Sequence, residues 1–191
     1  SVLDFDSYGC MFQWGRKNDG HADMTYHGND RDGTPINGII FNGISKSDDP
    51  GHSDFITVLA SDSRNKPDMD WQFYKTVNSD LWQGVNGKHN PCPSGFRVPT
   101  KEEWKEEYNG GMRSMTAAFN SLKLSTSGWR NISNASWSNV NRQAVFWSSE
   151  NNANPEEKEV SRSTSIQIWL NYYRSVDSFR GYGYPVRCIK D

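Results

Sequence analysis

Apolar residues recur at helical spacing in two stretches that follow residue 100. Trp104 and Tyr108 lie four positions apart, and apolar residues repeat every three to four positions through Ser114–Leu122. Thr100 and Glu103 form the pair typical of a capping box, and two glycines end the first pattern. The sequence therefore predicts one helix that starts after Thr100 and a second helix over Ser114–Leu122.

Alternating and β-branched patterns predict strands in much of the remaining chain. Within Ser165–Asn171, two isoleucines and Leu170 fall on one face, whereas Gln167 and Trp169 fall on the other. An aromatic residue on that second face either forms another core layer or belongs to a binding surface, and the core is favoured. The predicted strands are Met11–Trp14, Gly38–Phe41, Phe55–Leu59, Leu122–Ser125, Ala144–Ser149, Ser165–Asn171 and Tyr184–Ile189.

The two halves of the chain differ in texture. Residues 1–90 are rich in Gly and Asp and predict mostly loop, whereas residues 91–191 carry the strong signals. The aromatic cluster within Asp68–Trp82, which includes Trp71, Phe73 and Tyr74, predicts packing under a long loop. A length of 191 residues suits a single domain over 1–191. We expect an α+β fold, with two helices packed on short, mainly antiparallel sheets joined by long loops.

Composition and charge narrow the classes of partner. Hydrophobic residues make up only 34% of the chain while aromatic residues reach 13%, which predicts a core of few, large side chains. The net charge of −2 provides no basic field for nucleic acid or anionic lipid, so neither partner is expected. No apolar run is long enough to span a bilayer, and the first ten residues lack the pattern of a signal peptide.

Aromatic, guanidinium and amide side chains gather in residues 129–142 and 171–184, which we expect to be exposed loops. Such side chains are enriched on recognition surfaces, where rings stack on sugars or partner residues and amides both donate and accept hydrogen bonds. The alternative is that these rings cover the core while Gly181 and Gly183 serve the turn. The candidate ligand-binding residues are Tyr172, Tyr173, Arg174, Asp177, Phe179, Arg180, Tyr182, Trp129, Asn131, Trp137, Asn141 and Arg142.

Four sequence blocks occur in order along the chain: GCMFQWGRKNDG at 9–20, PCPSGFRVPTKEEW at 91–104, FWSSE at 146–150 and GYGYPVRCIKD at 181–191. Together they resemble the Fibrobacter succinogenes major paralogous domain family. The resemblance implies a C-type-lectin-like fold and a place among the surface and secreted proteins of Bacteroidetes. It is more specific for fold than for ligand.

The chain contains three cysteines. A bridge between Cys92 and Cys188 would join the start of the first helix to the last strand. It would close a loop of about 95 residues and contribute on the order of 4 kcal/mol. Such a bridge would place the protein in an oxidising compartment, outside the cell or at its surface. Cys10 is left over, and a small buried apolar residue is favoured there over a reactive thiol.

The C-type-lectin-like fold also carries the variable proteins of diversity-generating retroelements. The candidate stretches 129–142 and 171–184 are similar to the variable loops of those proteins, because Asn, Tyr, Ser and Asp recur in them. This second resemblance implies a diversified receptor-binding protein.

Metal-binding signals are weak. The four histidines are scattered and no CxxC pair exists, so no zinc site is expected. The paired tripeptides of calcium-dependent lectins are also missing. Oxygen-rich loops could still hold calcium, although solvated turns explain them better. We therefore expect no cofactor, with calcium as the open alternative at Asp48, Asp49 and Asp54 or at Asn29, Asp30 and Asp32.

Catalytic motifs are absent from the sequence, which has no GxSxG, HExxH or phosphate-binding glycine loop. The glutamates of the first predicted helix read as a solvated face. We expect a non-catalytic surface or secreted module that binds carbohydrate or protein on a cell surface. The alternatives are a structural subunit such as a fimbrial tip protein, a retroelement-diversified receptor-binding protein, and a glycoside-degrading enzyme that would depend on Glu102 or Glu156.

Overall fold

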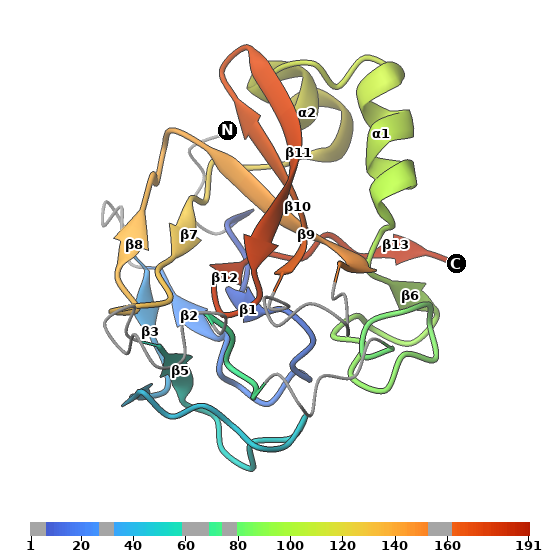
Figure 1. The fold of residues 1–191 in the computed structure, drawn as a ribbon. Coiled ribbons are helices and arrows are strands. Elements are labelled where there is room, and N and C mark those ends of the chain that lie inside the picture. Colours follow the sequence, from blue (N-terminus) through green and yellow to red (C-terminus); the bar gives the residue numbers. More distant parts are fainter. Residues whose placement is uncertain (1–6, 27–32, 59–68, 74–79, 153–161) are drawn as a thin grey trace.

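The computed structural model describes five stretches of the chain, and Figure 1 shows how they are arranged. These stretches are residues 7–26, 33–58, 69–73, 80–152 and 162–191. Among the residues singled out from the sequence, those outside the described stretches are Asn29, Asp30, Asp32, Leu59, Asp68, Tyr74 and Glu156.

Two helices and a set of mostly short strands make up the described structure, which is α+β as the sequence predicts. The helices are α1 (Lys101–Asn109) and α2 (Met115–Leu122). The strands are β1 (Phe12–Gln13), β2 (Met24–Thr25), β3 (Thr34–Pro35), β4 (Ile39–Phe41), β5 (Phe55–Thr57), β6 (Phe96–Arg97), β7 (Trp129–Arg130), β8 (Trp137–Ser138), β9 (Ala144–Asn151), β10 (Arg162–Trp169), β11 (Tyr172–Phe179), β12 (Gly183–Tyr184) and β13 (Ile189–Lys190).

The strands form several small sheets. One has four strands in the order β1-β12-β7-β8, and another has three long strands in the order β11-β10-β9. Three two-stranded sheets complete the set within the described residues, and the strands β4 and β5 pair in parallel. Because β10 and β11 are joined by a tight turn, they form a long hairpin that runs past the start of α2 in Figure 1. The backbone amide of Met115 donates to the carbonyl of Leu170 in that turn at 3.4 Å.

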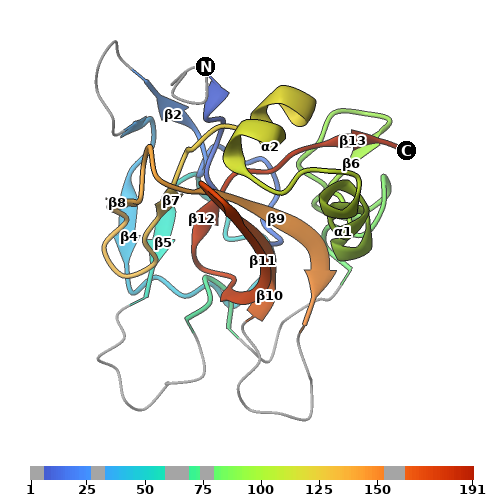
Figure 2. The same cartoon turned by 90° about the horizontal axis from the view of Figure 1, so that it is seen from above.

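Strand β9 lies between two hydrophobic clusters. Val145 and Trp147 belong to one cluster, while Ala144 and Phe146 belong to the other. Successive side chains of a strand point to opposite faces, so β9 is buried on both. The first cluster also contains Trp14, Trp82 and Tyr184. The second cluster joins the helices to the three-stranded sheet through Trp104, Met115, Ala118, Ile166 and Ile168. Figure 2 shows α1, α2 and this sheet from above.

Helix α1 starts as the sequence predicts. The backbone amide of Glu103 donates to the Thr100 hydroxyl at 3.2 Å, and the Thr100 amide donates to the Glu103 carboxylate at 2.8 Å. This reciprocal capping box satisfies donors that the first helical turn leaves open. The Glu103 carboxylate also accepts two hydrogen bonds from the Arg97 guanidinium, which contacts Asp191 near the last strand. The cap therefore holds the β6–β13 pair against the helix start.

A disulfide joins Cys92 to Cys188, with 5.7 Å between the Cα atoms. The bridge confirms the predicted pairing of these two cysteines. Cys10 is half-buried against the first cluster, and its thiol donates to Asp23. Burial, with Asp23 as the neighbouring charge, raises the pKa of the Cys10 thiol to about 11. The group therefore stays protonated and acts as a packing residue.

Several sequence expectations for the backbone are wrong. Residues 172–179 form strand β11, where we expected an exposed loop. Among the described strands, β11 pairs only with β10, so its other edge has no partner there and its pattern mixes polar and aromatic residues. The strand expected at Leu122–Ser125 is missing, because Leu122 ends α2 and Lys123 caps it in the left-handed conformation. The strand expected over Tyr184–Ile189 is split into β12 and β13.

Within the described residues, none of the helices has the length and apolar character needed to cross a membrane.

Candidate functional site

A hollow of about 350 Å³ opens on one face of the β10–β11 hairpin. We call it the hairpin hollow. Its volume falls at the small end of the range for ligand pockets, about 300–1,000 Å³. Its walls come from β7, β10, β11 and the segment around β12, so residues far apart in sequence meet there. The lining residues are Trp129, Gln143, Gln167, Trp169, Arg174, Val176, Asp177, Ser178, Phe179, Tyr182 and Tyr184.

Strand register decides which side chains face the hollow. Gln167 lies opposite Arg174 across the hairpin, and Trp169 lies opposite Tyr172. Residues two apart on a strand share a face, so Gln167, Trp169 and Arg174 point to the same side. The opposite face carries Ile166 and Ile168, which belong to the helix-side cluster. The hollow thus lies on the β10–β11 part of a sheet face that continues into the first cluster at β9, where Val145 lies opposite Gln167.

Asp177 contributes to the rim of the hollow but turns its carboxylate away. Asp177 pairs with Thr164 across the hairpin, and both side chains point to the face opposite the one that carries Gln167 and Arg174. The Asn152 amide donates both to the Asp177 carboxylate and to the Thr164 hydroxyl. Of the two charged residues that line the hollow, Arg174 is therefore the one whose side chain faces it.

A chain of amides holds Arg174 in place. The Gln167 side-chain oxygen accepts from Arg174 Nε at 2.9 Å and from Arg174 Nη2 at 2.7 Å. The same oxygen accepts from Gln143 Nε2 at 3.0 Å, and the Gln143 oxygen accepts from the Asn139 amide at 3.1 Å. Gln143 is buried, so this series of hydrogen-bonded amides is anchored in the protein interior.

Aromatic rings form the rest of the surface. Trp129, Trp169 and Tyr182 are each half-buried, so they keep part of their rings accessible. The Tyr182 ring stacks on Tyr184 with centroids 5.6 Å apart and planes within 7°. Burial raises the pKa of the Tyr184 hydroxyl, which keeps it neutral beside Ser178. The hollow therefore combines ring faces with amide, hydroxyl and guanidinium groups, a combination suited to polar ligands with apolar faces.

The predicted ligand-binding residues fall into two groups. Five of them line the hairpin hollow, and they are Trp129, Arg174, Asp177, Phe179 and Tyr182. The other seven lie elsewhere, and they are Tyr172, Tyr173, Arg180, Asn131, Trp137, Asn141 and Arg142.

Arg180 is fully buried, so the structure does not place it on a ligand-binding surface. Its guanidinium lies over the Trp14 ring at 4.7 Å and pairs with the buried carboxylate of Asp70 at 3.5 Å. Its Nη2 also donates to Gln72. Burial lowers the pKa of Arg180 and raises that of Asp70, while their mutual attraction opposes both shifts. Arg180 holds the segment at 69–73 against the core.

Tyr172 and Tyr173 occupy different surroundings despite being neighbours. Tyr173 is half-buried and stacks on Tyr108 of α1, with ring centroids 4.4 Å apart. Burial, with Tyr108 and Glu102 nearby, raises the pKa of its hydroxyl to about 12. Tyr172 is 51% exposed at the hairpin tip, next to Leu170, which is 71% exposed. Tyr173 therefore joins the hairpin to α1, whereas Tyr172 is open to solvent.

The predicted residues of the 129–142 stretch mostly shape its turns. Asn131 accepts from the amide of Ser133, and Asn141 accepts from the Tyr8 hydroxyl. The indole of Trp137 donates to the carbonyl of Gly33 at 2.6 Å. Arg142 is exposed and does not line the hollow.

Sequence analysis missed six lining residues. The alternation of Ser165–Asn171 does place Gln167 and Trp169 opposite the core isoleucines, and that signal could have identified them. Val176, Ser178 and Tyr184 lie within the stretch 171–184 that the sequence indicated, but no local pattern distinguishes them from their neighbours. Gln143 lies just outside the stretch 129–142. The missed residues are Gln143, Gln167, Trp169, Val176, Ser178 and Tyr184.

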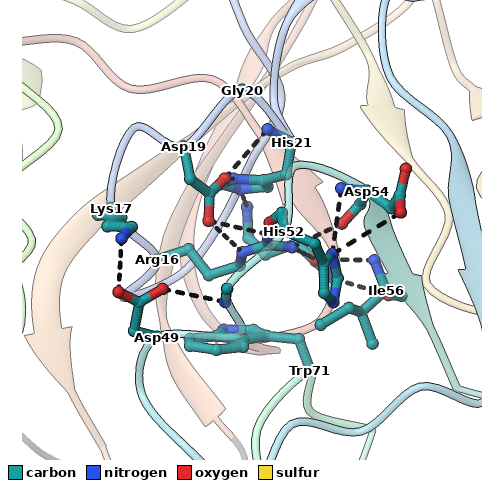
Figure 3. A network of polar contacts seen from close by, with 12 residues as sticks. Arg16, Lys17, Asp19, Gly20, His21, Asp49, His52, Asp54, Ile56 and Trp71 are labelled. Atoms are coloured by element: carbon teal, nitrogen blue, oxygen red, sulfur yellow. Dashed lines mark hydrogen bonds and ion pairs between the residues drawn. The ribbon is translucent and has the colours of Figure 1, made fainter.

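A buried polar network around Arg16 contains an aspartate–histidine pair (Figure 3). Gln13 N donates to His21 Nε2 at 3.1 Å, so His21 carries its proton on Nδ1 and donates it to Asp19 at 2.6 Å. The Arg16 guanidinium donates to Asp19, Gln13 and the carbonyls of His52 and Asp54. Burial lowers the pKa of His21 to about 4. The pair is neutral on the histidine side, with His21 buried and Asp19 partly buried, which fits structural support.

The candidate calcium ligands at Asp48, Asp49 and Asp54 are partly engaged by cations. Asp48 pairs with Lys88 at 2.7 Å, and Asp49 pairs with Lys17 at 2.5 Å. Across the described stretches, no group of three or more His, Cys, Asp or Glu side chains is arranged to hold a metal ion.

A second hollow of about 340 Å³ lies between α1 and the C-terminal segment. Its Glu103 is already bound to Thr100 and Arg97, and Trp104 belongs to the core. It therefore offers fewer accessible rings than the hairpin hollow. Its lining residues are Pro99, Glu103, Trp104, Glu106, Glu107, Leu122, Arg187, Cys188 and Ile189.

Comparisons of the chain with protein-family models, with curated proteins and with solved structures yield no match.

Proposed function

We propose that the protein is a non-catalytic binding module that recognises carbohydrate through the hairpin hollow, outside the cell or at its surface. One observation carries the proposal. The hollow combines accessible faces of Trp129, Trp169 and Tyr182 with the fixed polar groups of Gln167 and Arg174. Rings of this kind stack on the apolar faces of sugars, while amide and guanidinium groups bond to hydroxyls.

We also propose a C-type-lectin-like fold and a location in an oxidising compartment. Two helices packed on an antiparallel hairpin sheet support a C-type-lectin-like arrangement, in keeping with the family resemblance of the four sequence blocks. The Cys92–Cys188 disulfide supports an oxidising compartment. The proposal includes no catalytic residues, because Arg174 is the one charged side chain that faces inward among the described residues lining the hollow.

A glycan array tests the proposal. We expect the oxidised protein to retain selected saccharides, and Trp169→Ala to weaken that binding by about tenfold or more, a loss typical of an aromatic hot spot. The matched control is Tyr172→Ala, because Tyr172 lies directly opposite Trp169 but does not line the hollow. It should leave sugar binding within about twofold, and thermal melting should show both variants folded. Silence of the wild-type protein across the array would contradict the proposal.

A structural subunit is the second candidate, and the hairpin tip favours it. Leu170 and Tyr172 are among the most exposed large apolar residues of the described chain. Exposed apolar groups on a projecting turn can dock a neighbouring subunit. This role predicts self-association in sedimentation experiments that Tyr172→Ala disrupts and Trp169→Ala leaves intact, which is the reverse of the carbohydrate result.

A further inference from the structure

The free edge of the Arg174 guanidinium identifies the class of sugar that the hairpin hollow selects. An arginine has five N–H donors arranged in a fixed fork. The Nε and one Nη2 donor of Arg174 both go to the Gln167 oxygen. The end-on edge keeps one donor of Nη1 and the second donor of Nη2. Within the described stretches, no carboxylate forms an ion pair with Arg174.

That free edge is held ready for a ligand. Gln167 is fixed by Gln143, which is buried and bonded in turn to Asn139. The guanidinium plane therefore loses little rotational freedom when it binds. The end-on edge of a guanidinium matches the two oxygens of a carboxylate, which gives a bidentate, charge-assisted contact.

Nearby charges do not oppose an anionic ligand. Asp177 turns its carboxylate to the opposite face of the hairpin, where Asn152 binds it. The ionisable tyrosines of the hollow stay neutral, because burial raises the pKa of both Tyr182 and Tyr184. Arg174 therefore provides the formal charge that faces the hollow.

We propose that the hairpin hollow binds saccharides that carry a carboxylate. Arg174 binds the carboxylate, and the rings of Trp129, Trp169 and Tyr182 pack on the sugar rings. This inference rests on the proposed carbohydrate-binding function. Hexuronic and sialic acids share the required chemistry, a carboxylate attached directly to a sugar ring. The hollow has the volume of a small-ligand pocket, so it holds a short saccharide or the end of a longer one.

The test uses pairs of saccharides that differ only in the carboxylate. The full chain is titrated calorimetrically with oligohexuronates, with sialylated oligosaccharides, and with the carboxyl-reduced form of each. We expect at least one acidic saccharide to bind about tenfold or more tightly than its reduced counterpart, the range of a charge-assisted contact. Comparing the oligohexuronates with the sialylated oligosaccharides shows which kind of acidic sugar fits the hollow.

Three variants assign the preference to Arg174. Arg174→Gln should abolish the preference for the acidic form, so that each acidic saccharide binds no more tightly than its reduced counterpart. Arg174→Lys should retain part of the preference, because a lysine supplies charge without the fork. Arg142→Gln removes an exposed arginine outside the hollow and should change neither affinity.

The outcomes separate the inference from the function on which it rests. If every reduced saccharide binds as tightly as its acidic partner, and Trp169→Ala weakens both, the hollow binds sugars without selecting the carboxylate and the inference is overturned. An acidic preference that survives Arg174→Gln also overturns it. If no saccharide of either kind binds, both the inference and the proposed function are overturned.

Discussion

Arginines six residues apart on the same segment have opposite roles. Arg174 is exposed and held by Gln167, whereas Arg180 is buried over Trp14 and paired with Asp70. Arg16 and Arg130 are also buried, with their guanidiniums over the rings of Trp71 and Phe55. A buried cation is tolerated when hydrogen bonds and ring faces replace water. An arginine in an aromatic segment is therefore not by itself a sign of a binding surface.

His21 should make the stability of the fold depend on pH. Its pKa is about 4 in the folded chain against 6.5 for the ordinary group, because it is buried. The unfolded chain binds a proton near pH 6.5 and the folded chain does not until about pH 4. Stability is therefore complete above pH 6.5 and falls as the pH drops through this window, by up to about 3 kcal/mol.

Urea unfolding at pH 7, 5.5 and 4.5 checks this dependence. His21→Gln removes the titrating group, so its free energy of unfolding should fall less between pH 7 and 4.5 than that of the wild type. His52→Gln replaces a half-exposed histidine of the same network. Its free energy of unfolding should fall as much between pH 7 and 4.5 as that of the wild type. If the free energy of unfolding falls equally with pH in the wild type and in His21→Gln, then His21 is not the cause of the pH dependence.

At the scale of elements, signals within a few residues predicted the helices well. The capping pair, the apolar spacing and the terminal glycines of α1 act within one or two helical turns, so they can be read from the sequence. Strand β11 was missed for the opposite reason. Its pairing with β10 is set across the hairpin, and its sequence is a mixed pattern of polar and aromatic residues.

Glycines near β12 illustrate the same limit. One alternative from the sequence assigned Gly181 and Gly183 to the turn. Gly181 does lie in a turn, and both glycines are also closely packed. A Cβ on Gly181 would overlap Ile132 and lie 3.0 Å from the Met69 carbonyl oxygen. A Cβ on Gly183 would lie 3.0 Å from the Met11 carbonyl oxygen. These close approaches involve segments distant in sequence.

Glu103 should contribute more to stability than its neighbours on α1. It completes the capping box with Thr100 and also binds Arg97, although it is one-third exposed. We expect Thr100→Ala to cost about 1 kcal/mol and Glu103→Ala about 1–2 kcal/mol in urea unfolding. Glu106→Ala, at an exposed position of the same helix, is the control and should cost little. A Glu103→Ala loss no larger than that of the control would contradict this account.

At the scale of the molecule, β9 connects two cores and the disulfide ties the chain together. Val145 and Trp147 pack into one cluster and Ala144 and Phe146 into the other. The Cys92–Cys188 bridge spans 96 positions, from the approach to α1 to the C-terminal strand. Closing so long a loop restricts the unfolded chain and stabilises the folded one.

Removing the bridge should therefore destabilise the whole domain. We expect Cys92→Ser with Cys188→Ser to lower the free energy of unfolding by on the order of 4 kcal/mol in the chain-entropy model. Dithiothreitol should cause a similar loss in the wild type and none in the double variant. Cys10→Ser, which leaves the bridge in place, should have a smaller effect. A double variant as stable as Cys10→Ser would show that the bridge contributes little.

The sequence by itself determined the two helices, the α+β class, the aromatic core and the cysteine pair, because caps, apolar spacing and composition act over short distances. Only the tertiary structure decided which residues of 171–184 face the hairpin hollow. That choice depends on the β10–β11 register and on contacts such as Arg180 with Asp70, more than a hundred residues away. Burial and pairing between distant segments are not encoded in any local pattern, so Arg174 and Arg180 could be told apart only in three dimensions.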